Sequence, residues 1–187
     1  EKYTEIIAKE ILENSNEYKF ETIKTINREK SYKIDTHDGI YNPKSPRREE
    51  IIAMKMYKND YLDIGKILDY QIPLKDKQTT KAGKIDLISL KQDKLYLIEL
   101  KNDESKETLL RCILEIITYM NQIDKNKLKS DFKLDGVNVK PAILIFKNTR
   151  PCYDMNDEYV KKLIDKFQID VFVATSKELF NIEKIES

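Results

Sequence analysis

Apolar and polar residues alternate along the chain in blocks that predict helices and strands. Residues 4–14 and 46–59 have apolar side chains at helical spacing, and 64–74, 84–90 and 94–101 follow as strands. The remaining pattern predicts a long helix at 104–123, a buried strand at 142–146, a helix at 155–167, a strand at 170–174 and a last helix capped by Ser176. This order is typical of an α/β protein with helices on both faces of its sheet.

The first 45 residues form a different kind of segment. After the helix at 4–14 the chain is polar, with weak strand patterns at 19–26 and 31–34. A loop rich in Pro and Gly then marks a boundary near residue 45, where Ser45 is placed to cap the helix 46–59. We therefore expect a helical and irregular extension over 1–45 and one domain over 46–187.

The two strands 84–90 and 94–101 carry the most informative chemistry. If their turn centres on Gln92 and Asp93, Asp86 lies opposite Glu99, and Lys101 points to the same face. Facing carboxylates repel one another, and a divalent cation such as Mg²⁺ is the simplest compensation. The alternative is an exposed strand end, where these acids form ordinary ion pairs with Lys101 and Lys84.

The helix 104–123 is apolar except for one polar stripe. The stripe contains Arg111, Glu115, Thr118 and Gln122, and Tyr119 flanks it. A helix that directly follows strand 94–101 must pack back on the sheet, so this stripe can reach the carboxylates; a stripe facing solvent is the alternative. Just before Asp86, Gly83 permits a close approach to the backbone.

A third acid is available at the start of the helix 46–59. Glu49 and Glu50 both lie in its first turn, where acidic residues also favour the helix dipole. Of the two, we favour Glu50 as the functional acid.

Overall composition narrows the possible partners and compartment. The 34 Lys and Arg residues nearly cancel the 33 Asp and Glu residues, leaving a formal charge of +1, which argues against tight unspecific binding to nucleic acid. Cys112 and Cys152 make no disulfide framework, and there is no zinc-ligand set or phosphate-binding glycine loop. The chain also has no signal-peptide pattern and no membrane-spanning run, so we expect a cytoplasmic protein without a membrane partner.

These residues together resemble the PD-(D/E)XK nuclease superfamily over roughly residues 46–147. Asp86 matches its first acid, Glu99-Leu100-Lys101 its (D/E)XK tripeptide, and Glu50 its upstream acid. Gly83-Lys84-Ile85-Asp86 looks like the G-x-h-D form of exonuclease-like branches, and Glu115 to Tyr119 looks like their Q-x-x-x-Y motif. Two residues depart from the family pattern: Ile85 replaces Pro, and Glu115 replaces Gln.

The resemblance implies a restriction-endonuclease-like core, a mixed sheet flanked by helices, and metal-dependent hydrolysis of phosphodiester bonds, with DNA favoured. It implies that Asp86, Glu99 and the Leu100 carbonyl hold Mg²⁺, with Mn²⁺ as a substitute, while Lys101 orients water and Glu50 completes the acidic set. The residues expected to touch nucleic acid or brace the site are Arg47, Arg48, Lys84, Arg111, Glu115 and Tyr119.

Further partners and a rival function also follow from this comparison. A second copy of the chain or an accessory subunit would be in keeping with the family, with residues 1–45 as a candidate contact segment. Because a fold never proves activity, the alternative is a weakly active or inactive module that binds nucleic acid or a protein.

Overall fold

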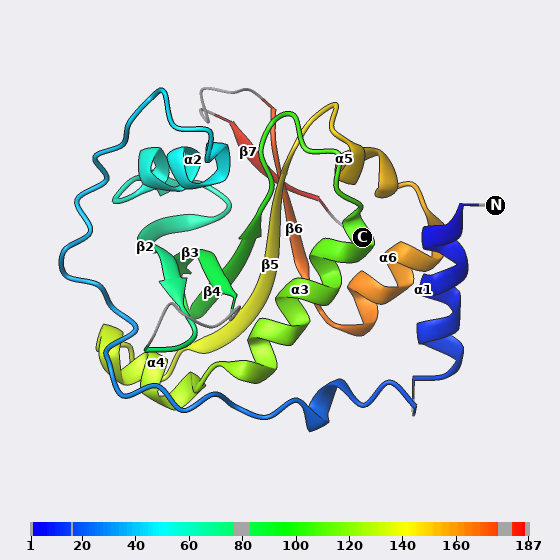
Figure 1. Cartoon of the computed structure of the whole chain (residues 1–187), viewed down its shortest axis with the longest axis horizontal. Coiled ribbons are helices and arrows are strands. Elements are labelled where there is room, and N and C mark those ends of the chain that lie inside the picture. The colour runs from blue at the N-terminus through cyan, green and yellow to red at the C-terminus, as the bar shows by residue number, and fades with distance from the viewer. Residues whose placement is uncertain (1, 16, 77–82, 176–180, 186–187) are drawn as a thin grey trace.

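A computed structural model describes residues 2–15, 17–76, 83–175 and 181–185. Within them, a single mixed sheet contains seven strands in sequential order (Figure 1). Strands β1 to β4 pair antiparallel, β4, β5 and β6 run parallel, and β7 returns antiparallel to β6. The strands are β1 (Asp60–Tyr61), β2 (Gly65–Pro73), β3 (Lys84–Lys91), β4 (Lys94–Leu100), β5 (Asn138–Phe146), β6 (Asp170–Ala174) and β7 (Ile182–Ile185).

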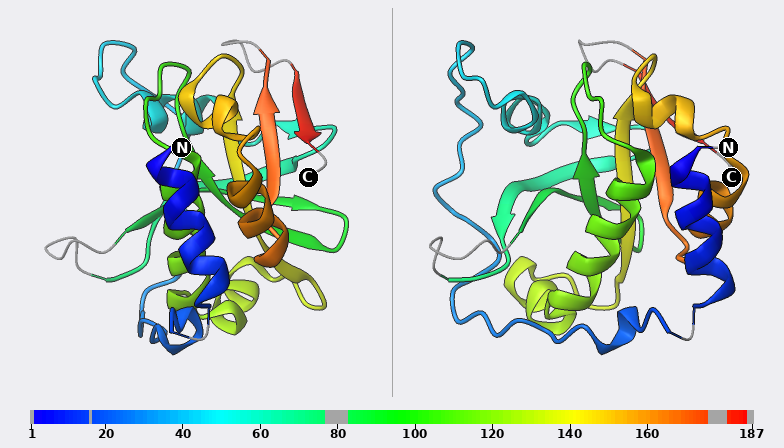
Figure 2. Two further views of the ribbon diagram at one scale, coloured as in Figure 1. Left: turned by 90° about the vertical axis from the view of Figure 1, so that its right-hand side faces the viewer. Right: turned by 45° about the vertical axis from the view of Figure 1, so that its right-hand side comes forward.

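Helices cover the two faces of the sheet unequally. The helices are α1 (Tyr3–Glu13), α2 (Arg48–Met56), α3 (Leu109–Gln122), α4 (Lys125–Phe132), α5 (Arg150–Asp154) and α6 (Glu158–Lys166), with one 3-10 turn at Phe20–Thr22. Helices α3, α6 and α1 lie side by side on one face, whereas α2 packs on the other face against β2 and β3 (Figures 1 and 2). The predicted α/β architecture with helices on both faces is confirmed.

The alternation of side chains along β4 divides the core in two. Leu95 and Leu97 pack in the core shared with α3 and α6, while Tyr96, Ile98 and Leu100 pack in the core beneath α2. All five side chains are almost fully buried, as expected for a strand with a covered layer on each side. Glu99 therefore belongs to the α3 side of the sheet, because it follows the parity of Leu95 and Leu97.

The sheet is so strongly twisted that it approaches a barrel (Figure 2). Its first and last strands are connected through a side chain: the backbone N–H of Lys184 in β7 donates to a carboxylate oxygen of Asp63, in the turn before β2, over 2.9 Å. The curled shape encloses the core beneath α2, where the rings of Tyr96 and Phe172 meet edge to face with their centres 5.4 Å apart.

The N-terminal segment wraps around the domain (Figure 1). Helix α1 packs against α6 and buries Ala8 and Ile11 in the α3-side core. The segment from 17 to 47, here called the strap, then crosses the molecule to reach α2. Backbone N–H groups of the strap bond to carboxylate side chains of the domain: the Tyr32 N–H donates to Asp131 and the Ile34 N–H donates to Asp69.

The strands expected at 19–26 and 31–34 are wrong. These residues form the 3-10 turn and irregular backbone, because the strap N–H groups bond to carboxylates and isolated carbonyls rather than to a neighbouring strand. One such bond joins the Ile26 N–H to the Gln122 carbonyl over 2.7 Å.

Several helix boundaries also differ from expectation. Helix α2 starts at Arg48, and Ser45 does not cap it, because the Ser45 hydroxyl accepts from the Arg47 N–H inside the preceding turn. The helix expected at 104–123 starts only at Leu109, behind a capping Thr108. The helix expected at 155–167 is α6, which starts only at Glu158, while the short helix α5 before it and α4, capped by Asp124, are elements that the pattern does not predict. Ser176 lies outside the described residues.

No described helix combines the length and apolar character that crossing a bilayer requires.

Candidate active site

The β3–β4 hairpin brings Asp86 and Glu99 to one end of the sheet. Its register is the predicted one, with Leu87 opposite Ile98 and Ile88 opposite Leu97, and the non-glycine turn residue Gln92 has a positive φ of 54°. Beyond these pairs, the Leu100 N–H donates to Asp86 Oδ2 over 2.8 Å. The first acid is therefore tied to the strand that carries the second.

Gln71 on β2 holds the other oxygen of Asp86. Its side-chain Nε2 donates to Asp86 Oδ1 over 2.8 Å. Gln71 has a φ of 49°, a left-handed conformation that is rare for a residue other than glycine and clusters at functional sites. Because both Asp86 oxygens accept a bond from a fixed donor, the orientation of this carboxylate is set before any ligand binds.

Lys101 lies at the centre of three carboxylates. Its Nζ is 2.7 Å from Glu99 Oε1, 2.9 Å from Glu107 Oε2 and 3.1 Å from Glu115 Oε2. Glu99 and Lys101 are only 4% and 6% exposed, so this strand end is not exposed, although Glu99 and Lys101 do form the ion pair that the alternative expects. Water does not screen these charges effectively, and the position of each one depends on its neighbours.

The protonation of the two central acids reflects this crowding. Burial raises the pKa of Asp86 to about 7, a rise that hydrogen bonds and Lys101 limit and the charge of Glu49 increases. Burial and the charge of Asp86 raise the pKa of Glu99 to about 9. Carboxylic acids with such pKa values take up protons near neutrality unless a cation compensates for their charge.

The pKa of Lys101 moves the opposite way from a lone buried amine. Burial lowers the pKa of Lys101, but attraction to Glu99 and hydrogen bonds to Glu107 and Glu99 outweigh this, so its pKa is raised. Burial would also raise the pKa of Glu115, yet its bonds to Glu99, Lys101 and Arg111 lower it. Lys101 is therefore a fixed ammonium group, suited to orienting a ligand rather than removing a proton.

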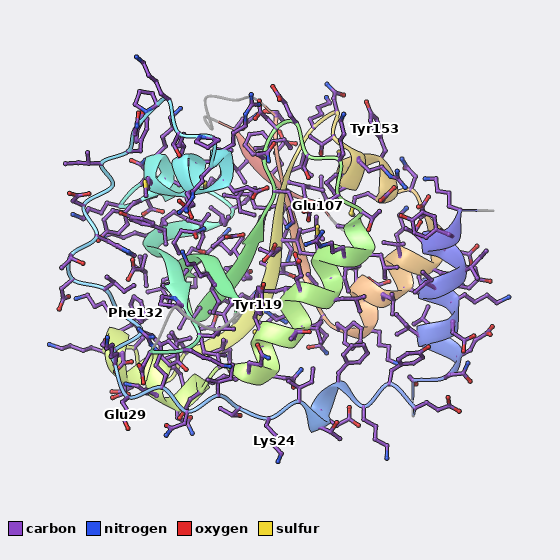
Figure 3. The ribbon with its side chains drawn as sticks, in the orientation of Figure 1. Lys24, Glu29, Glu107, Tyr119, Phe132 and Tyr153 are labelled. Carbon is purple, nitrogen blue, oxygen red and sulfur yellow. The ribbon has the colours of Figure 1, made fainter. Side chains whose placement is uncertain are left out.

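Helix α3 contributes to the site, as its polar stripe predicts. Arg111 Nε donates to Glu115 Oε1 over 3.0 Å, and Glu115 in turn reaches Lys101. Figure 3 shows Glu107 near the first turn of α3 and Tyr119 further along the helix. Within the stripe, Thr118 bonds its own helix instead, through its hydroxyl to the Leu114 carbonyl.

Tyr119 packs directly on the backbone of Gly83. A Cβ atom added at Gly83 would lie 2.3 Å from Cε1 of the Tyr119 ring and 2.5 Å from its hydroxyl oxygen. The close approach predicted for Gly83 is confirmed, and its partner is the tyrosine of the second predicted motif. Burial, with the charge of Glu99 nearby, raises the pKa of Tyr119, so the ring stays a neutral phenol.

Helix α2 presents Glu49, rather than Glu50, to the centre of the site. Glu49 Oε1 accepts from the Asn102 side chain over 3.0 Å, and its charge acts on Asp86. Glu50 instead pairs with Arg47 at 3.3 Å and with Lys84 at 3.9 Å. Glu49 is thus the residue of the two that contacts this part of the site, whereas the sequence pattern favours Glu50, and the choice of the functional acid stays a prediction.

The basic residues predicted to contact substrate are distributed around these acids. Arg111 is exposed and pairs with Glu107 and Glu115. Arg47 and Arg48 are also exposed at the start of α2, where Arg48 pairs with Glu104. Of these residues, Arg111 pairs with two acids of the Lys101 cluster, and the role of all three in binding substrate stays a prediction.

The donor set can be compared with what a divalent cation requires. Among the residues that the structure describes, no group of three or more His, Cys, Asp or Glu side chains is arranged to hold a metal ion. Mg²⁺ needs fewer protein ligands than that, because it binds through one or two carboxylates and keeps several waters. Asp86 and Glu99, with the Leu100 carbonyl, fit this requirement in donor type and number. The carboxylates also outnumber the cations Lys101 and Arg111 in this network of contacts: Glu49, Asp86, Glu99, Glu107 and Glu115.

Comparisons with known proteins add no assignment to this geometry. No protein-family model, curated protein or solved structure matches the chain.

Proposed function

We propose that the protein is a metal-dependent nuclease of the restriction-endonuclease-like type, hydrolysing phosphodiester bonds in nucleic acid, with DNA as the favoured substrate. The observation that carries this proposal is the junction of Asp86 on β3 with Glu99 and Lys101 at the end of β4, where Glu99 and Lys101 are buried. Lys101 Nζ is 2.7 Å from Glu99, and the Leu100 N–H ties Asp86 to the same tripeptide. These two acids and the lysine stand in the order of the PD-(D/E)XK motif that the sequence resembles.

Each residue then has a defined task. Asp86 and Glu99, with the Leu100 carbonyl, would hold Mg²⁺ or Mn²⁺, which when bound polarises the phosphate and lowers the pKa of water. Gln71 orients Asp86, and Glu49 orients Asn102 at the mouth of the site. Lys101 holds a positive charge beside the reacting phosphate and orients the attacking water.

The charge balance of the site supports a phosphate substrate only once a cation is present. Without one, the acidic excess around Lys101 repels phosphate, and Asp86 and Glu99 favour their protonated forms. A divalent cation offsets this excess, so a strongly basic overall charge is not needed. The near-neutral total of +1 is therefore compatible with a nuclease.

The rival function is a module with this fold that binds nucleic acid or a protein without cutting. The buried Lys101 cluster gives a reason to favour catalysis over this rival. Burying several charges together is costly, and well-packed apolar residues would be at least as stable. A cluster of buried charges is easier to explain if the charges take part in catalysis.

The decisive test is cleavage of labelled single-stranded and double-stranded DNA and RNA with Mg²⁺, Mn²⁺ or chelator. We expect metal-dependent cutting that Asp86→Asn and Lys101→Ala abolish. Because Lys101→Ala leaves Glu99, Glu107 and Glu115 without their shared cation, Lys101→Arg is the matched variant that keeps the charge but changes its shape. Equal cutting by wild type and Asp86→Asn would refute the proposal.

Metal binding separates the nuclease from the non-catalytic module. Titration with Mn²⁺ in a calorimeter should give heat that is lost in Asp86→Asn. It should also release protons, since the acids that take up the ion have raised pKa values. A chain without Mn²⁺ heat and without cutting would support the rival.

A further inference from the structure

A pocket lies beside the carboxylates, on the α2 side of the end of β4. Its volume is about 580 Å³, within the range of small-molecule sites. It is bounded by the end of the strap, by α2 and by the residues at the ends of β4 and β5. Its wall is mainly apolar, formed by Pro43, Pro46, Ile51, Ile52 and Phe146.

The pocket and the candidate active site share two short pieces of chain. In α2, Arg48 lines the pocket while its neighbour Glu49 bonds Asn102. After β4, Asp103 lines the pocket while Lys101, two residues earlier, holds the carboxylates together. Two residues span at most about 7 Å of backbone, so the pocket and the candidate active site lie at the same end of the sheet.

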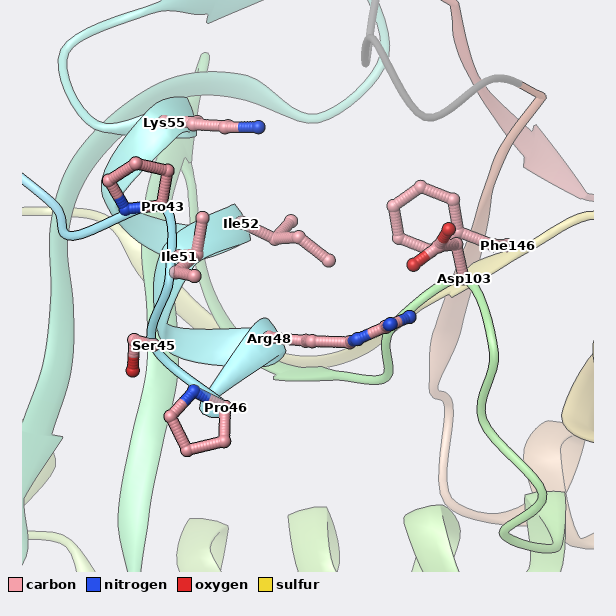
Figure 4. Close-up of a pocket in the computed structure, with 9 residues that line it drawn as sticks. All are labelled: Pro43, Ser45, Pro46, Arg48, Ile51, Ile52, Lys55, Asp103 and Phe146. Atoms are coloured by element: carbon pink, nitrogen blue, oxygen red, sulfur yellow. The ribbon is translucent and has the colours of Figure 1, made fainter.

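Polar groups are placed at the edge of this apolar wall. Arg48 and Lys55 lie seven residues apart on α2, which separates their backbones by about 10 Å along the helix. Figure 4 shows both side chains extended in one direction, with Ile52 between them and the Arg48 guanidinium turned toward Asp103. Arg48 pairs with the Glu104 carboxylate. Lys55 instead lies over the face of the Tyr41 ring in the strap, 5.3 Å from its centre, so Lys55 is the cation of the two that is more available to a phosphate.

We infer that this pocket receives one unpaired nucleobase of the substrate strand, so that the enzyme acts on single-stranded or frayed DNA; this rests on the proposed nuclease function. The apolar wall suits the faces of a base, which bind apolar and aromatic side chains without sequence preference. Asp103 accepts from an exocyclic amine, and Arg48 donates to a base carbonyl or ring nitrogen. Lys55 contacts the neighbouring phosphate.

A paired base cannot enter the pocket in this way. Its hydrogen-bonding edge is occupied by its partner and its faces are occupied by the stack, so a duplex would first have to open. Opening is least costly at an end, a mismatch or a single strand. The pocket therefore selects for unpaired strand next to the bond that is cut.

Binding measurements on the full chain test this inference independently of cleavage. The probe is a fluorescently labelled single-stranded deoxyoligonucleotide, bound to the Asp86→Asn chain so that it is not cut, with a blunt-ended duplex of the same sequence for comparison. The single strand should bind more tightly, by about tenfold, the size expected of one seated base. Lys55→Gln and the pocket-filling Ile51→Trp should each weaken it, whereas Lys24→Gln, an exposed lysine of the strap outside the pocket, should not.

The outcomes are distinguishable. If cutting depends on Asp86 but both pocket variants bind the single strand like wild type, the inference fails and the nuclease function stands. If nothing is cut but the pocket variants weaken binding, the inference stands and the nuclease function fails. Equal affinity for the blunt duplex, or full competition by free deoxyadenosine monophosphate, would refute a pocket for an unpaired base of a strand. Lys55→Gln changes an exposed side chain, so it keeps the test valid if Ile51→Trp misfolds.

Discussion

The backbone N–H of Leu100 donates a 2.8 Å hydrogen bond to the side chain of Asp86. A side chain on β3 thus replaces a backbone acceptor at the point where the hairpin ladder ends. The bond fixes Asp86 against the middle residue of Glu99-Leu100-Lys101. The relative position of the two acids is therefore a property of the hairpin and does not depend on a bound ligand.

Asp86→Asn should separate activity from folding. The new amide can keep both neighbours, accepting from the Leu100 N–H and donating to Gln71 once the Gln71 amide turns over. Without metal we expect thermal unfolding at the same temperature or higher, because the neutral amide replaces a carboxyl group whose raised pKa costs stability as it ionises. Cutting should fall by about 100-fold or more, since a metal ligand supplies several kcal/mol of transition-state stabilisation. Unfolding followed by circular dichroism, beside the cleavage assay, checks both parts. A variant that is unstable and inactive would show that Asp86 is mainly structural.

Glu49→Gln and Glu50→Gln form a matched pair on one turn of α2. Glu49 contacts Asn102 and influences Asp86, so we expect its loss to reduce cutting by about 10- to 100-fold, as for other groups that orient a metal site. Glu50 forms exposed pairs with Arg47 and Lys84, worth at most about 1 kcal/mol, so its loss should cost less than about fivefold. Initial rates under saturating Mg²⁺ decide between them. The reverse order would make Glu50 the third acid.

Stability without metal should fall as the pH rises. The pKa of Asp86 is about 7 and that of Glu99 about 9, both above the value near 4 of an unfolded carboxyl group. The folded chain therefore binds more protons than the unfolded chain between these limits, and the free energy of unfolding decreases through pH 7 and on toward 9. Urea unfolding from pH 5 to 9 with chelator measures it.

Two comparisons sharpen the pH prediction. Glu99→Gln should flatten the alkaline part of the curve, because it removes the group that titrates last. Mg²⁺ should stabilise the wild type most at high pH, where its ligands are already deprotonated. Stability that rises from pH 5 to 9 without metal would contradict the raised pKa values of both acids.

Gly83→Ala should disturb the site through Tyr119. The added Cβ would overlap the ring at 2.3 Å, and forcing extra atoms into a packed contact costs about 1–3 kcal/mol. We expect lower stability and slower cutting. The double variant Gly83→Ala with Tyr119→Ala should be more stable than the sum of the two single changes predicts, since the clash is then gone. Additive effects in a double-mutant cycle would exclude this contact as the cause.

The part of the site that lies within one hairpin could be predicted from sequence. Strand side chains alternate with a period of two, so a short turn fixes which residues face each other, and Asp86, Glu99 and Lys101 follow from it. The reach of Glu115 also followed, because a helix directly after β4 must return over the sheet. These inferences needed only local geometry.

The remaining contacts depend on information that the pattern does not contain. The choice between Glu49 and Glu50 depends on where α2 starts, and α2 begins at Arg48 rather than two residues earlier. Gln71 reaches Asp86 from a backbone with a positive φ, a conformation for which glutamine has no special preference. Glu107 lies in the loop before α3, which the periodicity had included in the helix. The only sign in the sequence that Glu107 belongs to the site is its acidic side chain, a few residues after Lys101.

The bond between Lys184 and Asp63 has a consequence for how the sheet behaves in a crowded solution. Strand edges with unpaired N–H groups are templates on which other chains can add strands and aggregate. Here a carboxylate from the turn before β2 engages an N–H of β7, and the twist turns the two ends of the sheet toward one another. The same curvature that shapes the core thus helps to protect the chain against edge-to-edge association.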